Sequence, residues 1–415
     1  MRQAAWTIAA QVLSSVANFG LTIAVARAVD AQVGGAFAYA FLVFSLVIAV
    51  SRAVTTDPLT IRFSAAAAAD RDVAIAQAAS SAAGVGLLSG VVCALVGLVL
   101  GGDLGLALLM LAVVLPGQLL QDAWRSAAFA SNDARRATVN DGLRVVVQFA
   151  GIALVIWSGV DSLVWYMGAW AAGAWAAALL GMWQFRRPSG AARSLAWLRA
   201  HAGLSVRLGS GILINMGAVT LTTSLLVVVV GVADTGGLRF AQSVLGPIQV
   251  LFGAVTAFMV PLLARRLARS GPGSLRRPAA LVSLGALAVS AAVVAVLLVI
   301  PPSVGEELLG DSWQGARAVM AAVGTMQCFV ALSLGASHLV MAMGRADLML
   351  RIALLQAPLL LALGVGGGVI FGIEGAAWGL AAAQGIGCAV IVFLAWRARP
   401  DRSGSLAPEA PAAAG

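Results

Sequence analysis

Long apolar stretches recur along the whole chain, and they limit its possible folds more than any other feature. A helix that crosses the hydrocarbon core of a bilayer needs about 20 consecutive, mostly apolar residues. Only 10% of the residues are charged, against roughly 25% in soluble domains. The sequence therefore predicts an all-α polytopic membrane protein with twelve transmembrane helices and no separate soluble domain. These helices are expected at residues 5–27, 35–54, 74–100, 104–124, 142–158, 162–184, 205–232, 238–262, 280–301, 316–343, 349–371 and 375–396.

Arginine side chains alternate between the two predicted sides of the membrane. Cytoplasmic ends of transmembrane helices collect basic residues. With the N-terminus inside, 23 of the 26 basic residues fall on inner ends, and only Arg27, Arg239 and Arg317 fall on outer ends. This pattern predicts a multi-pass protein with both termini in the cytoplasm. The net charge of +9 follows this topology, and no basic tract interleaved with aromatic residues indicates a nucleic acid partner.

Two pairs of segments are related by about half the length of the chain. The turn "VDAQVGG" around Asp30 resembles "GVADTGG" around Asp234, and a second set of matches has a constant offset of 213 positions. We interpret both as traces of a duplication, the alternative being chance similarity in Ala- and Gly-rich sequence. The second set pairs Gly151, Gly159, Asp161, Trp165 and Trp183 with Gly364, Gly372, Glu374, Trp378 and Trp396.

The duplication predicts two parallel six-helix halves, because an even number of helices brings both halves into the membrane from the same side. The N-terminal bundle is expected over residues 1–200, including a basic inter-half loop from about 185, and the C-terminal bundle over 201–397. The tail, 398–415, is rich in Pro, Ala and small polar residues and is predicted to be disordered in the cytoplasm. Halves of this kind can rock around a central cavity, which is the architecture of alternating access.

Few polar side chains are expected inside the membrane. Asn and Gln are costly to bury in lipid, so a cavity role and a helix-contact role are both open for Asn18, Asn215 and Gln249. Guanidinium groups bind phosphate through two parallel hydrogen bonds, so a basic path would suit a phosphate-bearing substrate. The alternative is that inner-end arginines reflect topology alone. Candidates for such a path are Arg52, Arg62 and Arg125 near the inner side and Arg27 and Arg239 at the outer side.

The remaining ionisable residues indicate neither an enzyme nor a metal site. Asp122 is the nearest candidate for an intramembrane carboxylate, but a surface pair with Arg125 is the preferred interpretation. The absence of a mid-depth carboxylate counts against transport driven by protons or sodium. His201 and His338 have no ligand partners at suitable spacing, so no cofactor is predicted. The three cysteines, Cys93, Cys328 and Cys388, lie far apart in apolar stretches and are interpreted as packing residues.

The chain resembles the polysaccharide-transporter (Wzx-like) branch of the multidrug/oligosaccharidyl-lipid/polysaccharide (MOP) exporter superfamily. The resemblance rests on the two six-helix halves, the first hairpin "VARAVDAQVGGAFAYAFLVF", its repeat "GVADTGGLRFAQSVLG" and the segment "TTDPLTIRFSA". It implies a V-shaped, MATE-like transporter that flips lipid-linked oligosaccharides, with arginines of the central cavity binding the diphosphate. Arg27, Arg52 and Arg239 lie on the corresponding helices, although the sequence places none of them clearly at mid-depth.

The predicted function is therefore that of a flippase in a bacterial cytoplasmic membrane, which moves a polyprenyl-diphosphate-linked oligosaccharide for cell-surface polysaccharide biosynthesis. Its expected partners are the lipid-linked glycan, membrane lipids, a glycan polymerase and glycosyltransferases. The alternatives are an ion-coupled multidrug or metabolite antiporter of the same fold and a non-transporting scaffold for glycan assembly. Diphosphate contacts are predicted at Arg27, Arg52, Arg62, Arg125 and Arg239, and sugar or headgroup contacts at Asn18, Asn215, Gln242 and Gln249.

Overall fold

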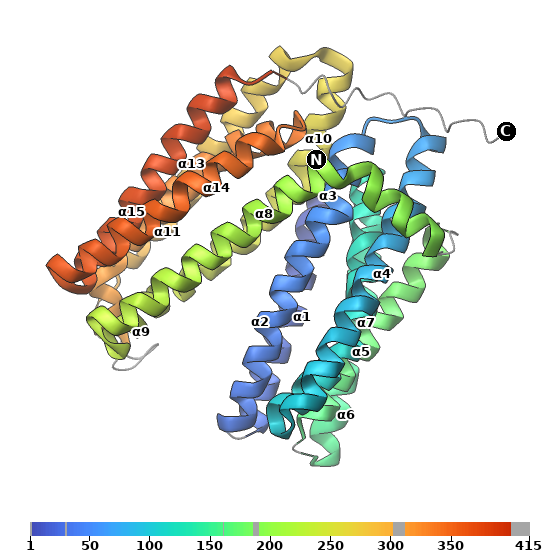
Figure 1. The fold of residues 1–415 in the computed structure, drawn as a ribbon, viewed down its shortest axis with the longest axis horizontal. Coiled ribbons are helices and arrows are strands. Elements are labelled where there is room, and N and C mark those ends of the chain that lie inside the picture. The colour runs from blue at the N-terminus through green and yellow to red at the C-terminus, as the bar shows by residue number, and fades with distance from the viewer. Residues whose placement is uncertain (1, 30, 161, 186–190, 302–311, 400–415) are drawn as a thin grey trace. The chain divides into compact units, whose positions relative to one another are not determined.

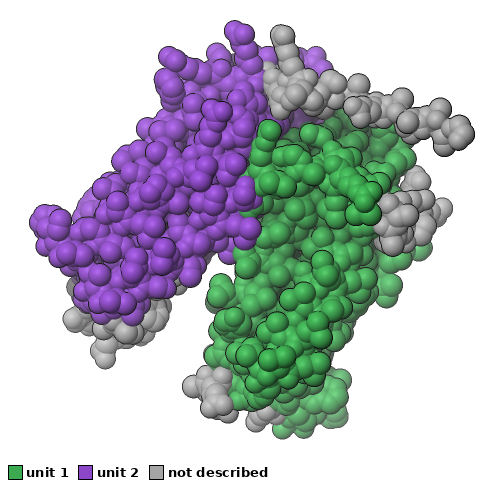
Figure 2. Space-filling view, in the orientation of Figure 1, with its two compact units in different colours: residues 1–209, 405–415 green, residues 210–404 purple. Residues whose placement is uncertain are grey.

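The computed structural model describes residues 2–29, 31–160, 162–185, 191–301 and 312–399, and its secondary structure in these segments is helical (Figure 1). Two compact units divide the chain, Met1–Gly209 and Ser210–Gly404 (Figure 2). The expectations for the outer loop around Glu306 and Glu307, for the basic inter-half loop at 186–190 and for the tail beyond residue 399 lie outside the described residues.

Unit 1 is a helical bundle built around α5, which contacts five other helices of the unit. Glycines on α4 allow its backbone to approach α5 closely: a Cβ at Gly90 would lie 2.7 Å from the carbonyl oxygen of Ala112. Small residues at helix contacts are typical of membrane proteins, where close van der Waals packing holds helices together. The helices are α1 (Arg2–Ala28), α2 (Ala31–Val54), α3 (Thr56–Phe63), α4 (Ala68–Leu100), α5 (Gly102–Ala130), α6 (Ala134–Ser158), α7 (Leu163–Phe185) and the first part of α8 (Ala191–Val230).

Unit 2 is a second helical bundle, in which α13 contacts α9, α10, α11, α14 and α15. It begins within α8, so this helix belongs partly to each unit. Its further elements are α9 (Val232–Val244), α10 (Gly246–Ser270), η1 (Pro272–Leu275), α11 (Arg276–Val299), α13 (Ser312–Ala342), α14 (Ala346–Leu359), η2 (Leu360–Val365) and α15 (Gly366–Arg397).

The number of helices that could span a membrane agrees with the sequence. Within the described residues, eleven helical runs are long and apolar enough, and the last of them, Ala346–Arg397, has 52 residues. Its backbone leaves helical geometry at Phe371 and Gly372, and Gly379 packs directly on the carbonyl oxygen of Leu363, so the chain folds back on itself. This run is long enough for two crossings, so the expected all-α fold is confirmed and the count is consistent with twelve membrane helices.

The two repeated segments with an offset of 213 residues share a backbone feature. Gly159, which follows α6, has φ +66°, and Gly372 at the break in α15 has φ +65°. Residues with a side chain rarely adopt this left-handed conformation, whereas glycine adopts it readily. Both segments therefore turn at a glycine placed at the same position of the proposed repeat.

Several helix boundaries differ from those expected, and polar residues explain the differences. Helix α6 begins at Ala134, eight residues before the expected start at 142, and α8 begins at Ala191 instead of 205. Polar and charged residues hide these starts because a hydropathy pattern registers only the apolar part of a helix. The helix expected at 238–262 is instead divided into α9 and α10, with Pro247 in the first turn of α10. Proline is tolerated there because the first turn needs no backbone N–H donor.

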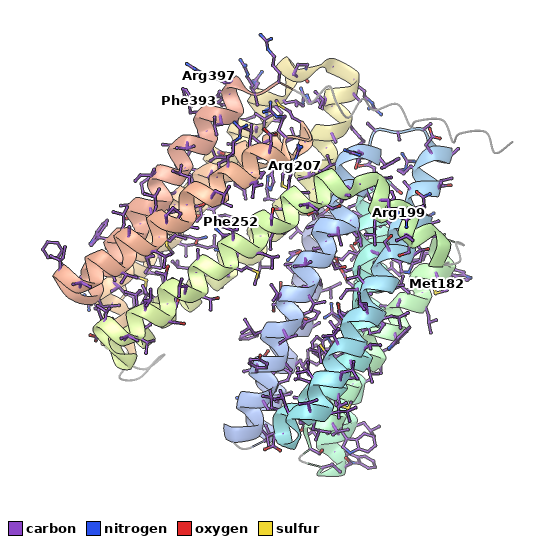
Figure 3. All side chains as sticks on the ribbon, in the orientation of Figure 1. Met182, Arg199, Arg207, Phe252, Phe393 and Arg397 are labelled. Carbon is purple, nitrogen blue, oxygen red and sulfur yellow. The ribbon has the colours of Figure 1, made fainter. Side chains whose placement is uncertain are left out.

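The first part of α8 is amphipathic. Trp197 and His201 are buried in unit 1, where the ring centroid of Trp197 lies 5.7 Å from that of Phe63 on α3. The exposed face of the same segment carries Arg199 and Arg207 (Figure 3). At about 1.5 Å per residue, the 40 residues of α8 extend about 60 Å, twice the thickness of the hydrocarbon core. One crossing therefore uses only part of this helix.

Candidate functional site

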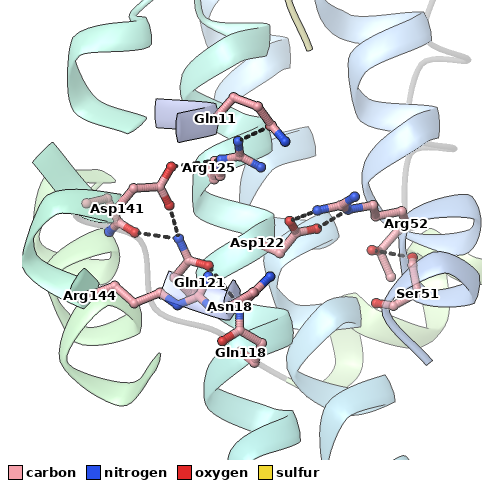
Figure 4. Close-up of polar contacts among 12 residues, drawn as sticks. Gln11, Asn18, Ser51, Arg52, Gln118, Gln121, Asp122, Arg125, Asp141 and Arg144 are labelled. Atoms are coloured by element: carbon pink, nitrogen blue, oxygen red, sulfur yellow. Dashed lines mark hydrogen bonds and ion pairs between the residues drawn. The ribbon is translucent and has the colours of Figure 1, made fainter. Parts of the chain in front are cut away.

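A network of polar and charged side chains lies inside unit 1, contributed by α1, α2, α5 and α6 (Figure 4). Along α5 it lies beside the boundary between two apolar cores, one of which ends at Leu119 while the other begins at Leu120. Most of the network is buried: Gln118, Gln121, Asp122, Arg125, Asn140, Asp141, Arg144 and Gln148 are each at most 7% exposed.

The centre of the network is an ion pair between Arg125 of α5 and Asp141 of α6. The Nε of Arg125 donates to Oδ2 of Asp141 at 2.9 Å, and its Nη2 donates to Oε1 of Gln11 on α1 at 2.8 Å. Gln121 donates to the other oxygen of Asp141 at 2.8 Å. Three helices are therefore joined by one charged pair and its hydrogen bonds, which satisfy groups that would be costly to bury alone.

A second ion pair, between Arg52 of α2 and Asp122 of α5, lies at the edge of the network. Two parallel hydrogen bonds join them, from Nε to Oδ2 at 2.9 Å and from Nη2 to Oδ1 at 2.6 Å. The Asp122 side chain is 7% exposed, whereas that of Arg52 is 44% exposed. Arg52 is thus the member of the network whose charge reaches the surface of unit 1.

Helix α1 is attached to α6 by polar side chains of α6. Arg144 donates from Nη2 to Oδ1 of Asn18 at 2.7 Å, and Gln148 donates to the carbonyl oxygen of Ala17 at 2.7 Å. Thr138 donates to the carbonyl oxygen of Trp6 at 2.8 Å. The Nε of Arg144 has no hydrogen-bond partner among the described residues, so this buried cation is only partly satisfied.

Positive and negative charges in the network are nearly equal in number. Arg52, Arg125 and Arg144 face Asp122 and Asp141 within it, and Asp57 of α3 lies close enough to Arg52 to interact electrostatically. The positions are deep: Asp122 lies eight residues before the end of α5 and Arg144 ten residues inside α6, or about 12 Å and about 15 Å along the helices. Even insertion scales assign a lone charge at the centre of a membrane helix about 2.5–3.5 kcal/mol, so the pairing offsets a real cost.

The interpretation of Asp122 and Arg125 as a surface pair is wrong. Both side chains are buried, and each binds a different partner: Asp122 binds Arg52, and Arg125 binds Asp141. Asp122 and Asp141 lie within two of the runs that could span a membrane, several residues away from the nearer end of each helix. The error has a physical cause: the apolar pattern ended α5 at residue 124 instead of 130 and began α6 at 142 instead of 134, which placed these carboxylates at the helix ends.

Three of the predicted site residues, Asn18, Arg52 and Arg125, belong to the network. Arg62, in the last turn of α3, lies near His201 instead. Arg27 is exposed in the last turn of α1, nine residues beyond Asn18, or about 14 Å along the helix.

The other predicted residues belong to unit 2. Gln249 of α10 is exposed and donates to Oε1 of Gln327 on α13 at 3.0 Å. Asn215 of α8 and Gln242 of α9 are half-buried. Arg239 lies in α9, and its side chain is outside the described residues.

Sequence reasoning missed Gln11, Gln118, Gln121, Asn140, Asp141 and Gln148 as site residues, and it treated Arg144 only as an inner-end cation. A signal for them exists in the sequence. Gln118, Gln121 and Arg125 recur at intervals of three and four residues, as do Asp141, Arg144 and Gln148. Polar residues at helical spacing in an apolar helix form one polar stripe, which indicates contact with another polar surface.

No protein-family model matches this sequence, and no curated protein sequence matches it. Solved structures resemble the chain over 95% of its length. A MOP superfamily transporter from Pyrococcus furiosus is 14% identical, with a TM-score of 0.75 over 94% of that chain. An outward-facing multidrug resistance MATE family transporter gives the same values.

The MATE transporter ClbM, solved in complex with Rb⁺, is 13% identical, with a TM-score of 0.71 over 93% of that chain. Identity at this level carries the likeness of the fold and no more. The chain therefore has the all-helical, multi-pass membrane fold of the MATE transporters of the MOP superfamily.

Proposed function

We propose that this protein is a flippase that moves a polyprenyl-diphosphate-linked oligosaccharide across a bacterial cytoplasmic membrane by alternating access. The proposal rests on the position, exposure and orientation of the Arg52 side chain. This arginine lies inside the apolar run Val33–Phe63, it is half-exposed, and its guanidinium plane is held in one orientation by Asp122. The fold of known transporters supports the transport part of the proposal.

The hydrogen bonds of Arg52 leave donors for a phosphate. A guanidinium has five N–H donors, and Arg52 uses Nε and Nη2 for Asp122. Its Nη1 donates to no other described residue. A planar, permanently charged group with remaining donors is suited to a phosphate oxygen, and the oriented side chain loses less conformational entropy on binding than a free one.

The neutral residues predicted for the glycan remain part of the proposal. Asn18 is engaged by Arg144, whereas the half-buried Asn215 and Gln242 belong to unit 2. Amide side chains both donate and accept hydrogen bonds, which suits sugar hydroxyls. The proposed partners are the lipid-linked glycan, membrane lipids, and the polymerase and glycosyltransferases of the same pathway.

The test exchanges the charges of the exposed pair. In a double variant with Arg52→Asp and Asp122→Arg, the ion pair is kept but the half-exposed group becomes negative. The probe is a polyprenyl diphosphate carrying a short fluorescent oligosaccharide in proteoliposomes, and flipping is measured by its accessibility to an external quencher. We expect at least about a tenfold loss, because one charge-assisted hydrogen bond contributes about 1.5–3 kcal/mol.

The matched control is Arg269→Gln, which removes an exposed arginine at the end of α10. It should flip the probe at the wild-type rate and keep the wild-type thermal unfolding midpoint. Wild-type flipping by the charge-exchanged variant would refute the role of Arg52.

An ion-coupled antiporter is a second candidate, and a specific observation favours it. Asp122 and Asp141 are buried carboxylates inside membrane segments, which is the residue type that proton- or sodium-driven transporters use. Transport of a cationic dye driven by an imposed proton or sodium gradient, with no flipping of the glycolipid probe, would support this candidate over the flippase.

A further inference from the structure

His338 of α13 is a buried imidazole in unit 2. The residue is 2% exposed, and its Nε2 lies 2.9 Å from Oγ1 of Thr256 on α10. The adjacent residues Ala336, Leu339 and Val340 all belong to one apolar core of this unit. A polar ring in such surroundings is costly unless both nitrogens are satisfied.

The hydrogen bond to Thr256 determines which nitrogen of the neutral ring carries the proton. The hydroxyl of Thr256 has one hydrogen, and it donates that hydrogen to the carbonyl oxygen of Phe252 at 2.9 Å. With its hydrogen on that carbonyl, Oγ1 accepts from His338, and this arrangement corresponds to the tautomer with the proton on Nε2. In the neutral ring, Nδ1 then has a lone pair, and it has no hydrogen-bond partner among the described residues.

His201 in unit 1 provides an internal contrast. Its Nδ1 lies 3.0 Å from the carbonyl oxygen of Trp197, which can only accept, so Nδ1 carries the proton in that ring. The two histidines of the chain are thus assigned opposite neutral tautomers. In both rings the nitrogen that binds the protein is the protonated one, so the basic nitrogen is Nε2 in His201 and Nδ1 in His338.

The helices packed against this part of α13 present neutral groups to it. Helix α10 presents Thr256, and α11 presents Ser283, whose oxygen accepts from the backbone N–H of Gly335. Among the described residues, no charged side chain interacts electrostatically with the His338 ring. The cysteines of the helices that α13 contacts, and of α13 itself, are Cys328 on α13 and Cys388 on α15. The charged residues of the same helices are Asp234 and Arg239 on α9, Arg265, Arg266 and Arg269 on α10, Arg276 and Arg277 on α11, Arg317 on α13, Asp347 and Arg351 on α14, and Glu374 and Arg397 on α15.

We propose that His338 is a proton-binding site, with Nδ1 as the atom that receives the proton. A proton needs only one basic atom, whereas a metal ion needs several ligands, and no group of three metal-binding side chains occurs among the described residues. Protonation converts the neutral ring into an imidazolium between α10, α11 and α13. Because a charge in an apolar core disfavours close packing, proton binding loosens the contact of α13 with α10 and α11.

Proton binding at His338 is independent of the substrate proposed above, and its test needs no glycolipid. The full-length protein is labelled with ¹⁵N in histidine only and studied by NMR in lipid nanodiscs, where two imidazole signals are expected. His338→Gln assigns the signals. Glutamine keeps an N–H donor toward Thr256 and does not titrate, so the fold should be retained.

We expect one ring in the Nε2–H tautomer, absent from His338→Gln, which becomes protonated as the pH is lowered from about 8 to about 4. An Nδ1–H tautomer for His338, or a signal unchanged over that range, would overturn the proposal.

The transport consequence is measured separately on the same variants. Transport by the wild type should vary by more than about fivefold with pH over this range, and that of His338→Gln by less than about twofold, since histidine is the side chain that titrates there. His201→Gln is the matched control and should keep the pH dependence of the wild type. A His338→Gln variant with an unchanged pH profile would refute the coupling of this proton to transport.

Discussion

The buried ion pair between Arg125 and Asp141 should be essential to the stability of unit 1, and the variant Asp141→Asn tests this. Only 8% of the Arg125 side chain and 1% of the Asp141 side chain are exposed. Asparagine keeps the shape and can still accept from Gln121, but it leaves a buried guanidinium without its counter-charge. Two charges about 4 Å apart at an effective dielectric constant of about 20 interact by about 4 kcal/mol. This agrees with the roughly 3–5 kcal/mol lost when one partner of a buried pair is removed.

The assay is thermal unfolding of the purified protein in detergent. A loss of this size in a unit of about 200 residues should lower the unfolding midpoint by roughly 6–20 °C. The matched control is Asp133→Asn, because the Asp133–Arg136 pair is exposed and asparagine also caps the start of α6. Its expected effect is below about 1 kcal/mol.

A double variant with Arg125→Met and Asp141→Leu should lose less stability than Asp141→Asn, because the guanidinium of Arg125 is then no longer buried without its counter-charge. If Asp141→Asn lowers the midpoint no more than Asp133→Asn does, the pair is not structural and the reasoning fails.

Two glycines provide further predictions, both measured by the same thermal assay. Gly335→Ala should destabilise unit 2 by about 1–3 kcal/mol, because a Cβ would overlap the carbonyl oxygen of Ala279. The control is Gly285→Ala on α11, where a Cβ meets open space, and equal unfolding midpoints for the two variants would contradict this packing. Gly372→Ala should cost about 1–2 kcal/mol, because φ there is +65°, and Gly366→Ala in the helical part of α15 serves as its control. A Gly372→Ala protein as stable as its control would show that the turn does not need the left-handed conformation.

The positions of the membrane helices could be read from the sequence, because each depends on a local apolar run. The break between the last two helices is an example: a glycine at 372 divides a run that is otherwise continuously apolar, and the structure has φ +65° at that residue. The boundaries of α6 and α8 could not be read in this way, because their first turns are polar. The same polar turns concealed Asp141 and Arg144, which the structure places inside the network.

The sequence by itself determined that this chain has many helices apolar enough to cross a membrane and that it turns near Gly159 and Gly372. The turns expected at the pairs Gly34–Gly35 and Gly236–Gly237 are wrong, because these glycines lie inside α2 and α9. Only the tertiary structure decided the partners of each charge. Arg52 is 70 residues from Asp122, Gln11 is 114 residues from Arg125, and Asn18 is 126 residues from Arg144. The helical period fixes which side chains lie on one face, but the neighbour that this face meets depends on how separate helices pack, and such packing is not encoded in any local pattern.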